Sequence, residues 1–211
     1  MCGITGYWAK QAGVLTEGTL QRMNTALRRR GPDGEGYFEE PGIGLAMRRL
    51  AVIDLAGGWQ PVYNEDHSVV VVMNGEVYNY QALTKKLLEK GHHFSTHSDT
   101  EVIPHLYEEY GDELVKHLEG MFAFALWDKN RKRLLLARDR MGIKPLFFGF
   151  TGNHLLFGSE IKALLASGLI SKRIDADAID DLFAYNFIPQ RIFDDLDSIV
   201  IQIKLTVGFF R

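Results

Sequence analysis

The feature of this sequence that most limits its fold is a series of short apolar runs separated by turn residues. The runs are rich in β-branched, aliphatic and aromatic residues, a composition typical of β-strands. Polar connections such as Asp128-Lys129-Asn130 and Thr151-Gly152-Asn153 join neighbouring runs and indicate antiparallel hairpins. The predicted strands are residues 3–8, 36–39, 43–48, 69–73, 121–128, 133–137, 146–150 and 155–158.

Helical spacing of apolar residues separates these strands into groups. Gly91 and Gly111 follow two of the helical segments and predict that the helices end there. Because strands and helices are grouped rather than strictly alternating, we expect an α+β fold built on antiparallel sheet. The predicted helices are residues 15–28, 81–90, 100–110, 161–166 and 176–184.

Charge and hydropathy exclude several classes of protein. The formal net charge is -3 with charges of both signs interspersed, so no basic field for nucleic acid is expected. The first residues lack the basic and apolar regions of a signal peptide. The longest apolar runs, at 69–73 and 121–127, are much shorter than the roughly 20 residues that span a bilayer. These features predict a cytoplasmic protein with no membrane segment.

Cys2 is the one cysteine of the chain, so it cannot form an internal disulfide. Removal of Met1 would place a thiol and a free α-amine on the same residue. Such amines generally have a pKa of about 7.7–8.0 and can act as bases near neutral pH. Cys2 could thus be an N-terminal nucleophile with its own base. From its position alone, the alternative is a small buried apolar residue.

The tripeptide Asn74-Gly75-Glu76 follows the apolar run at 69–73. Between two β-like segments, Asn-Gly is most often a hairpin turn. The functional alternative is that the Asn74 amide and the Gly75 N–H stabilise a developing oxyanion. The dipeptide alone leaves both interpretations open.

Charged residues at the ends of predicted strands and helices can likewise have a local structural role or a role in binding. Ser98 and Glu101 fit a capping box at the start of a helix, where Asp99 would favour the helix dipole. Arg49 lies where a strand ends, so it is either solvated or a buried arginine that binds a substrate carboxylate.

Metal and cofactor motifs are weak. His92, His93 and His97 lie in a polar segment without cysteine or a matched pair on a helix, so no metal is expected. Glycine-rich dinucleotide and phosphate-loop motifs are absent from the sequence, so no cofactor is expected.

Taken together, the motifs resemble the glutaminase domain of glutamine-hydrolysing asparagine synthetases, which are class II glutamine amidotransferases. Each motif is weak alone, but their order is specific and covers about residues 2–190. They are Cys2-Gly3-Ile4, Arg30-Gly31-Pro32-Asp33, Arg49-Leu50-Ala51-Val52-Ile53-Asp54, Gln60-Pro61, Asn74-Gly75-Glu76-Val77-Tyr78-Asn79, Ser98-Asp99-Thr100-Glu101, Gly120-Met121-Phe122-Ala123-Phe124-Ala125, Arg138-Asp139 with Gly142 and Lys144-Pro145-Leu146, and Ser159-Glu160 with Lys162-Ala163-Leu164.

The resemblance implies a fold and a set of catalytic residues. The expected fold is the four-layer αββα sandwich of N-terminal-nucleophile hydrolases, with two antiparallel sheets between helical layers. Cys2 is implied to be the nucleophile, with its α-amine carrying protons, and Asn74 and Gly75 to form the oxyanion hole. The loop at 30–33 is expected near the site.

The resemblance also implies how glutamine is bound. Arg49 is expected to bind the α-carboxylate, while Glu76 and Asp99 hold the α-ammonium, an arrangement that suits a zwitterion. Main-chain atoms of three further residues are expected to line the pocket: Leu50, Val52 and Ile53. The implied products are glutamate and ammonia, released through a thioester on Cys2.

We expect residues 1–190 to form the glutaminase domain and residues 191–211 to be an atypical or truncated end. The ATP- and magnesium-dependent synthetase domain is expected to be absent, because its Ser-Gly-Gly nucleotide loop does not occur. A synthetase domain or partner chain would then accept the ammonia, and a homodimer is a further expected assembly. The alternatives are a glutaminase serving a sugar-phosphate or phosphoribosyl acceptor and a non-catalytic glutamine sensor.

Overall fold

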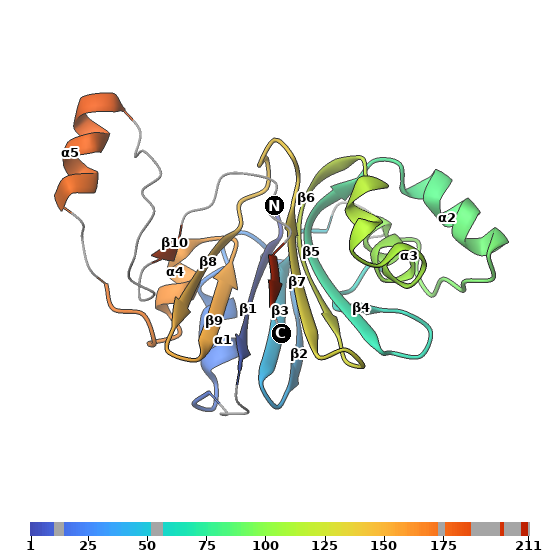
Figure 1. The fold of residues 1–211 in the computed structure, drawn as a ribbon, viewed down its shortest axis with the longest axis horizontal. Helices are drawn as coiled ribbons and strands as arrows, with labels where there is room; N and C mark the ends of the chain where they lie inside the picture. Colours follow the sequence, from blue (N-terminus) through green and yellow to red (C-terminus); the bar gives the residue numbers. More distant parts are fainter. Residues whose placement is uncertain (11–14, 52–56, 173–175, 187–198, 201–207, 211) are drawn as a thin grey trace.

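The computed structural model describes residues 1–10, 15–51, 57–172, 176–186, 199–200 and 208–210. Two sheets pack face to face, and helices cover the outer face of each sheet (Figure 1). Every strand pair in both sheets is antiparallel. The chain is therefore an α+β sandwich with helical layers outside.

The first sheet contains the N-terminal strand near its centre. Its order is β10 (Ile199–Val200), β8 (Phe147–Thr151), β9 (His154–Gly158), β1 (Gly3–Ala9), β3 (Ile43–Arg49) and β2 (Gly34–Glu40). The second sheet has the order β11 (Gly208–Phe210), β7 (Arg133–Arg138), β6 (Gly120–Asp128), β5 (Val69–Val77) and β4 (Val62–Tyr63).

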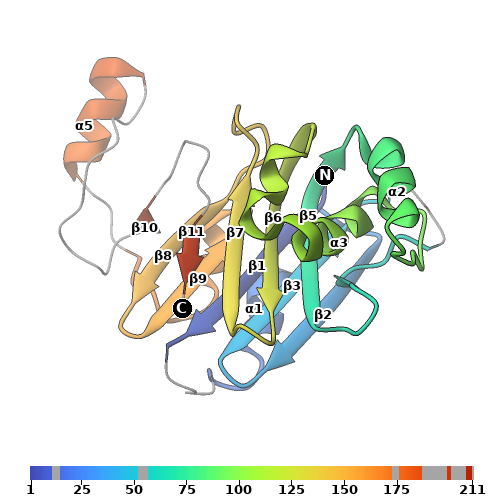
Figure 2. The same ribbon diagram turned by 45° about the vertical axis from the view of Figure 1, so that its right-hand side comes forward.

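The helices flank the two sheets on opposite sides (Figures 1 and 2). Against the first sheet lie α1 (Thr19–Thr25) and α4 (Ile161–Leu165). Against the second lie α2 (Tyr80–Glu89) and α3 (Val102–Tyr110), with 3₁₀ turns η1 (Asp99–Glu101) and η2 (Gly111–Lys116) before and after α3. In both views α5 (Ala176–Tyr185) lies apart from the sheets.

Strand periodicity explains why this sandwich has three apolar layers. In β5, Val70 and Val72 point between the sheets, whereas Val69, Val71 and Met73 pack toward α2 and α3. Successive side chains of a strand point to opposite faces, so a strand that is covered on both faces reads as a continuous apolar run. The third layer lies between the first sheet and helices α1 and α4.

Most predicted elements are present, with shifted ends. Gly91 and Gly111 have positive φ values of 99° and 55° and follow α2 and α3, as predicted. The helix predicted at 15–28 spans only Thr19–Thr25, and its start is set by Gly18, which adopts the left-handed conformation just before it. The strand predicted at 69–73 continues to Val77.

The C-terminal segment contributes short pieces to both sheets. Ile199–Val200 pairs with β8 and Gly208–Phe210 pairs with β7. The rest of 191–211 lies outside the described residues. Across the part of the chain that the structure describes, no helix is long and apolar enough to cross a membrane.

The layer between the second sheet and α2 and α3 can be tested with Phe124→Ala. Phe124 is fully buried there, so truncation leaves a cavity and should lower the free energy of unfolding by about 3–5 kcal/mol. Urea denaturation measures this change. As a control, Leu88→Ala on α2 removes a side chain that is 53% exposed and should change stability by less than about 0.5 kcal/mol. Equal losses of unfolding free energy in Phe124→Ala and Leu88→Ala would contradict the assigned layers.

Candidate active site

Cys2 lies directly before β1, which β3 and β9 flank on either side. Its carbonyl oxygen accepts a hydrogen bond from Arg30 Nε at 2.9 Å. Two residues on, Ile4 N donates to Ser159 Oγ at 3.0 Å. Leu50 N–H donates to Cys2 Sγ, with an N to S distance of 3.3 Å. The main chain around Cys2 is thus fixed, and its sulfur has a hydrogen-bond donor beside it.

The loop at 30–33 supports this arrangement from two sides. Arg30 also forms an ion pair with Glu160 at 3.2 Å, which holds the guanidinium that contacts Cys2. Asp33 N donates to the Arg49 carbonyl at 3.0 Å, and Asp33 Oδ2 accepts from Ala51 N at 2.9 Å. Asp33 therefore fixes Arg49 and Ala51, the two neighbours of Leu50, whose N–H donates to Cys2 Sγ.

Asn74 and Gly75 lie within β5, opposite Ala123 and Phe122 of β6. The hairpin-turn interpretation of Asn-Gly is therefore wrong. The Asn74 side chain is buried, and its Nδ2 has no hydrogen-bond partner among the described residues. A Cβ at position 75 would lie 2.2 Å from the Met121 carbonyl oxygen, so only glycine fits there. A buried amide N–H without a partner is costly, and it becomes useful if a ligand oxygen accepts from it.

Two carboxylates lie near one another here, Glu76 on β5 and Asp99 on the 3₁₀ turn η1. Asp99 is buried, and its Oδ2 accepts a hydrogen bond from Val77 N at 2.7 Å. Burial raises the pKa of Asp99; the Val77 hydrogen bond opposes this rise, and the negative charge of Glu76 adds to it. A cationic group of a ligand would relieve the repulsion between the two carboxylates.

The segment around Asp99 is only partly a capping box. Ser98 Oγ accepts from Thr100 N at 3.3 Å, as expected of a cap. The Glu101 carboxylate does not reach back to Ser98. It accepts instead from the main-chain N–H groups of Ser95 and Thr96, each at 2.7 Å. Glu101 therefore orders the preceding loop, and Asp99 is left at the pocket.

Arg49 ends β3 and is buried, so the solvated alternative is wrong. Its guanidinium carbon lies 5.0 Å from the centre of the Trp59 ring, a cation–π distance. A buried guanidinium has a fixed fork of donors that suits a carboxylate.

These groups meet in one pocket of about 120 Å³. It combines a thiol, hydrogen-bond donors, a buried arginine and two carboxylates, a set that can bind a small zwitterion beside a nucleophile. The lining residues are Met1, Cys2, Arg49, Leu50, Gly58, Gln60, Asn74, Gly75, Glu76, Ser98, Asp99, Thr100 and Lys144. The predicted contacts of Val52 and Ile53 lie outside the described residues.

Gln60 and Lys144 line the pocket, although the sequence analysis gave them no role. Gln60 Oε1 accepts from Met73 N at 2.6 Å, and its Nε2 donates to Thr100 Oγ1 at 3.3 Å. Gln60 thus connects β5 to the 3₁₀ turn that carries Asp99. Lys144 N donates to Asp139 Oδ2 at 3.0 Å. Gln60-Pro61 and Lys144-Pro145-Leu146 are both among the motifs shared with asparagine synthetases, and this was the signal that could have identified the two residues.

Comparisons with known proteins agree with the fold. The chain is similar to glutamine phosphoribosylpyrophosphate amidotransferase of B. subtilis, with a TM-score of 0.64 and 22% identity, covering 79% of this chain and 44% of that one. At this identity the likeness shows the fold alone. The expected α+β sandwich with two antiparallel sheets is confirmed.

Sequence comparisons find relatives of higher identity. The chain is 44% identical over 188 residues to "Asparagine synthetase [glutamine-hydrolyzing] 3" of Bacillus subtilis, covering 87% of this chain and 30% of that protein. It is 49% identical over 170 residues to "Asparagine synthetase [glutamine-hydrolyzing] 2" of Arabidopsis thaliana, covering 78% of this chain and 28% of that protein. The chain thus spans less than a third of the length of these relatives.

A family model described as a glutamine amidotransferase domain matches residues 1–205. The resemblance to the glutaminase part of asparagine synthetases is therefore confirmed, and the chain belongs to the glutamine amidotransferase domain family.

Proposed function

We propose that this chain hydrolyses glutamine to glutamate and ammonia through a γ-glutamyl thioester on Cys2. One observation carries this proposal: the Cys2 thiol shares a pocket with the Asn74 amide, which is buried and has no hydrogen-bond partner among the described residues. A nucleophile beside such a donor is what acyl transfer requires. Family membership supports glutamine as the amide donor.

In the proposed first step, the α-amine of Cys2 takes the proton of its own thiol, and the resulting thiolate attacks the side-chain carbonyl carbon of glutamine. A carbon–sulfur bond forms while the oxygen becomes an oxyanion, which accepts hydrogen bonds from Asn74 Nδ2 and Gly75 N–H. The carbon–nitrogen bond then breaks, and the leaving nitrogen takes a proton from the α-ammonium of Cys2. Water then gives a proton to the α-amine of Cys2 while its oxygen attacks the thioester carbon. The carbon–sulfur bond breaks, which releases glutamate and returns Cys2 to its thiolate and α-ammonium form.

This proton transfer requires removal of Met1. With Met1 attached, the Cys2 nitrogen is an amide, which is not a base at neutral pH. Met1 also lines the pocket, so its removal would clear space for the substrate. The proposed active form therefore begins at Cys2.

Binding of the substrate follows from the charges at the pocket. Arg49 would bind the α-carboxylate of glutamine, and Glu76 and Asp99 would bind its α-ammonium. The main chain of Leu50, Val52 and Ile53 would complete the wall. Fixing both charged ends of the zwitterion positions the side-chain amide over the thiol.

The ammonia is proposed to pass to an asparagine-forming synthetase domain or partner chain that is outside this sequence. Identities of 44% and 49% to asparagine synthetases favour this acceptor over a sugar phosphate or phosphoribosyl group. The thiol chemistry itself needs no cofactor, and ATP and magnesium would serve only the synthetase part. Cytoplasmic location and a homodimer are part of the same proposal.

Cys2→Ala should abolish glutamate release, because it removes the atom that forms the thioester. The measurement is glutamate and ammonia production by the purified chain, with intact mass spectrometry to quantify Met1 removal. Protein that retains Met1 provides a second control and should be inactive. Glutamine binding without turnover in the processed parent would instead support the sensor alternative.

Asn74→Ala should lower kcat about 10²–10³-fold, because an oxyanion-hole donor acts chiefly in the transition state. The KM for glutamine should change much less. Steady-state kinetics measure both values. A rise in KM with unchanged kcat would assign Asn74 to ground-state binding instead.

Asp99→Asn should have opposite effects on the stability of the protein and on its binding of glutamine. The raised pKa of Asp99 means that its ionised form costs stability in the folded state, so removal of the charge should leave Tm unchanged or higher. The Asn oxygen can still accept from Val77 N. The KM should rise about 10-fold or more, since a hydrogen bond to a charged group contributes about 1.5–3 kcal/mol.

The matched control is Glu89→Gln, which removes an exposed carboxylate on α2. This substitution should change neither Tm nor the KM for glutamine. A clear fall in the Tm of Asp99→Asn with an unchanged KM would mean that Asp99 is structural.

A further inference from the structure

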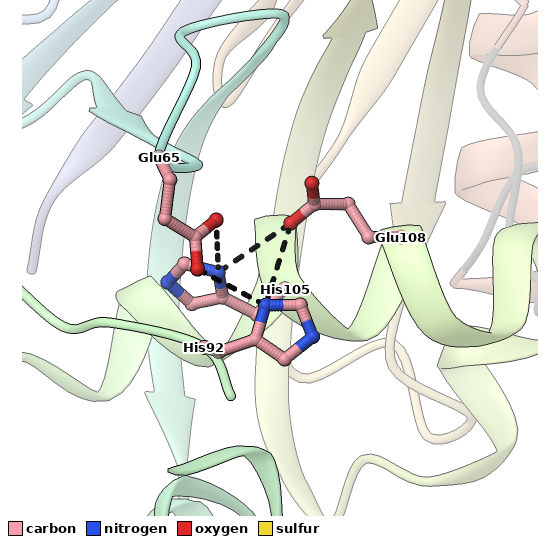
Figure 3. A group of neighbouring side chains, drawn as sticks. All are labelled: Glu65, His92, His105 and Glu108. Atoms are coloured by element: carbon pink, nitrogen blue, oxygen red, sulfur yellow. Dashed lines mark hydrogen bonds and ion pairs between the residues drawn. The ribbon is translucent and has the colours of Figure 1, made fainter. Parts of the chain in front are cut away.

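A second cluster of ionisable side chains lies outside the pocket (Figure 3). Glu65 comes from the turn between β4 and β5, His92 follows α2, and His105 and Glu108 lie one turn apart on α3. One nitrogen or oxygen atom from each side chain lies within 4.8 Å of the others. Three segments distant in sequence thus bring four potential metal ligands together.

The ring of His105 is the least satisfied member of the cluster. His105 is fully buried, and neither ring nitrogen makes a hydrogen bond to the described residues. Its Nδ1 instead lies near two carboxylate oxygens, 3.3 Å from Glu65 Oε2 and 3.5 Å from Glu108 Oε2. A buried imidazole without hydrogen bonds is unfavourable, and a metal ion would satisfy its Nδ1 and offset both negative charges.

The spacing of the ligand atoms suits a tetrahedral ion. Glu65 Oε2 and Glu108 Oε2 lie 3.3 and 3.5 Å from His105 Nδ1, and Glu108 Oε2 lies 3.7 Å from His92 Nδ1. His92 Nδ1 also contacts the other oxygen of Glu65, Oε1, at 3.1 Å. Zinc bonds to nitrogen and oxygen of about 2.0–2.1 Å in a tetrahedron imply ligand-to-ligand distances of about 3.3 Å. The three distances between the proposed ligand atoms are therefore close to those of a tetrahedral zinc site.

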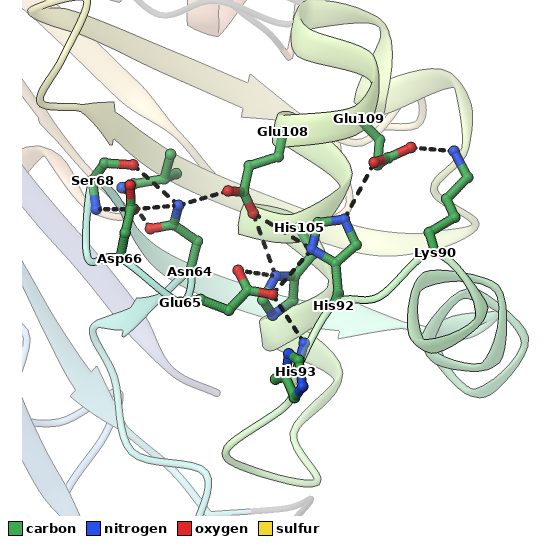
Figure 4. A network of polar contacts seen from close by, with 11 residues as sticks. Asn64, Glu65, Asp66, Ser68, Lys90, His92, His93, His105, Glu108 and Glu109 are labelled. Atoms are coloured by element: carbon green, nitrogen blue, oxygen red, sulfur yellow. Dashed lines mark hydrogen bonds and ion pairs between the residues drawn. The ribbon is translucent and has the colours of Figure 1, made fainter.

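Outer contacts direct three of these ligands inward (Figure 4). Glu109 Oε1 lies 3.4 Å from His92 Nε2, which leaves Nδ1 facing the cluster. Asn64 Nδ2 donates to Glu108 Oε1 at 2.9 Å, and so leaves Oε2 facing inward. The N–H of His93 donates to Glu65 Oε1 at 2.9 Å. Carboxylate and main-chain partners of this kind are usual behind metal ligands.

We propose that Glu65, His92, His105 and Glu108 bind a divalent transition-metal ion, with zinc the best match to two imidazoles and two carboxylates. All four tetrahedral positions would be filled by protein, so the ion is structural. It joins the β4–β5 turn and the segment after α2 to α3, the helix that directly follows Asp99–Glu101.

This proposal departs from the sequence expectation of no metal. Of the three histidines considered there, His92 alone supplies a ligand, and His93 contributes its main-chain N–H. The decisive partner, His105, lies on a helix whose apolar spacing gave no sign of metal binding.

The test uses tag-free full-length chain carrying Cys2→Ala, so that the active-site thiol cannot bind the probe. The protein is stripped with a chelator and titrated with Zn²⁺ against a competing chromophoric chelator, and Tm is recorded with and without the ion. One equivalent should bind and raise Tm, because an ion that binds only the folded state stabilises it. Co²⁺ at the same site should give the visible absorption of tetrahedral cobalt.

Variants locate the site. His92→Gln and Glu108→Gln change partly exposed ligands that can be replaced without opening the core, and each should weaken Zn²⁺ binding about 100-fold or more. Glu109→Gln changes only an outer contact and should weaken it about 10-fold. His117→Gln, at an exposed histidine outside the cluster, should leave the affinity unchanged. Absence of a saturable equivalent, or equal affinity in His92→Gln and the parent, would overturn the proposal.

Discussion

The position of Cys2 depends on the register of β1 in the middle of the first sheet. With β3 on one side and β9 on the other, the strand cannot slide without exchanging its core-facing and helix-facing side chains. Contacts from Arg30 and Leu50 then fix the carbonyl and the sulfur of the preceding residue. A residue beside a chain end, normally a flexible place, thus becomes a positioned group.

The second sheet presents the complementary half of the pocket. The close approach of β5 to β6 at Gly75 requires a residue without a side chain, and the same stretch holds Asn74 with a donor that no described group uses. Gln60 links this strand to the turn carrying Asp99. The site therefore lies where the ends of the two sheets meet. Each sheet is packed on both faces by an apolar layer.

The sequence allowed the fold class and most strands to be predicted, because two-sided burial in β5 to β7 leaves long apolar runs. Ordered motifs, rather than local pattern, predicted a set of site residues of which seven line the pocket: Cys2, Arg49, Leu50, Asn74, Gly75, Glu76 and Asp99. They gave no role to Gln60 and Lys144, which also line it. Local pattern alone favoured a hairpin at Asn74-Gly75, since a dipeptide cannot reveal that β6 continues to pair with it. It equally could not reveal the Glu65, His92, His105 and Glu108 cluster, whose members meet only through packing of α3 against the second sheet.

The proposed reaction requires a covalent thioester between the glutamyl group of the substrate and Cys2. The most direct test is to mix the Met1-processed chain with glutamine, quench with acid within the first turnovers and analyse the protein by mass spectrometry with peptide mapping. We expect a glutamyl adduct on the N-terminal peptide that disappears as substrate is exhausted. Steady release of glutamate with no adduct at Cys2, or with an adduct on another residue, would contradict it.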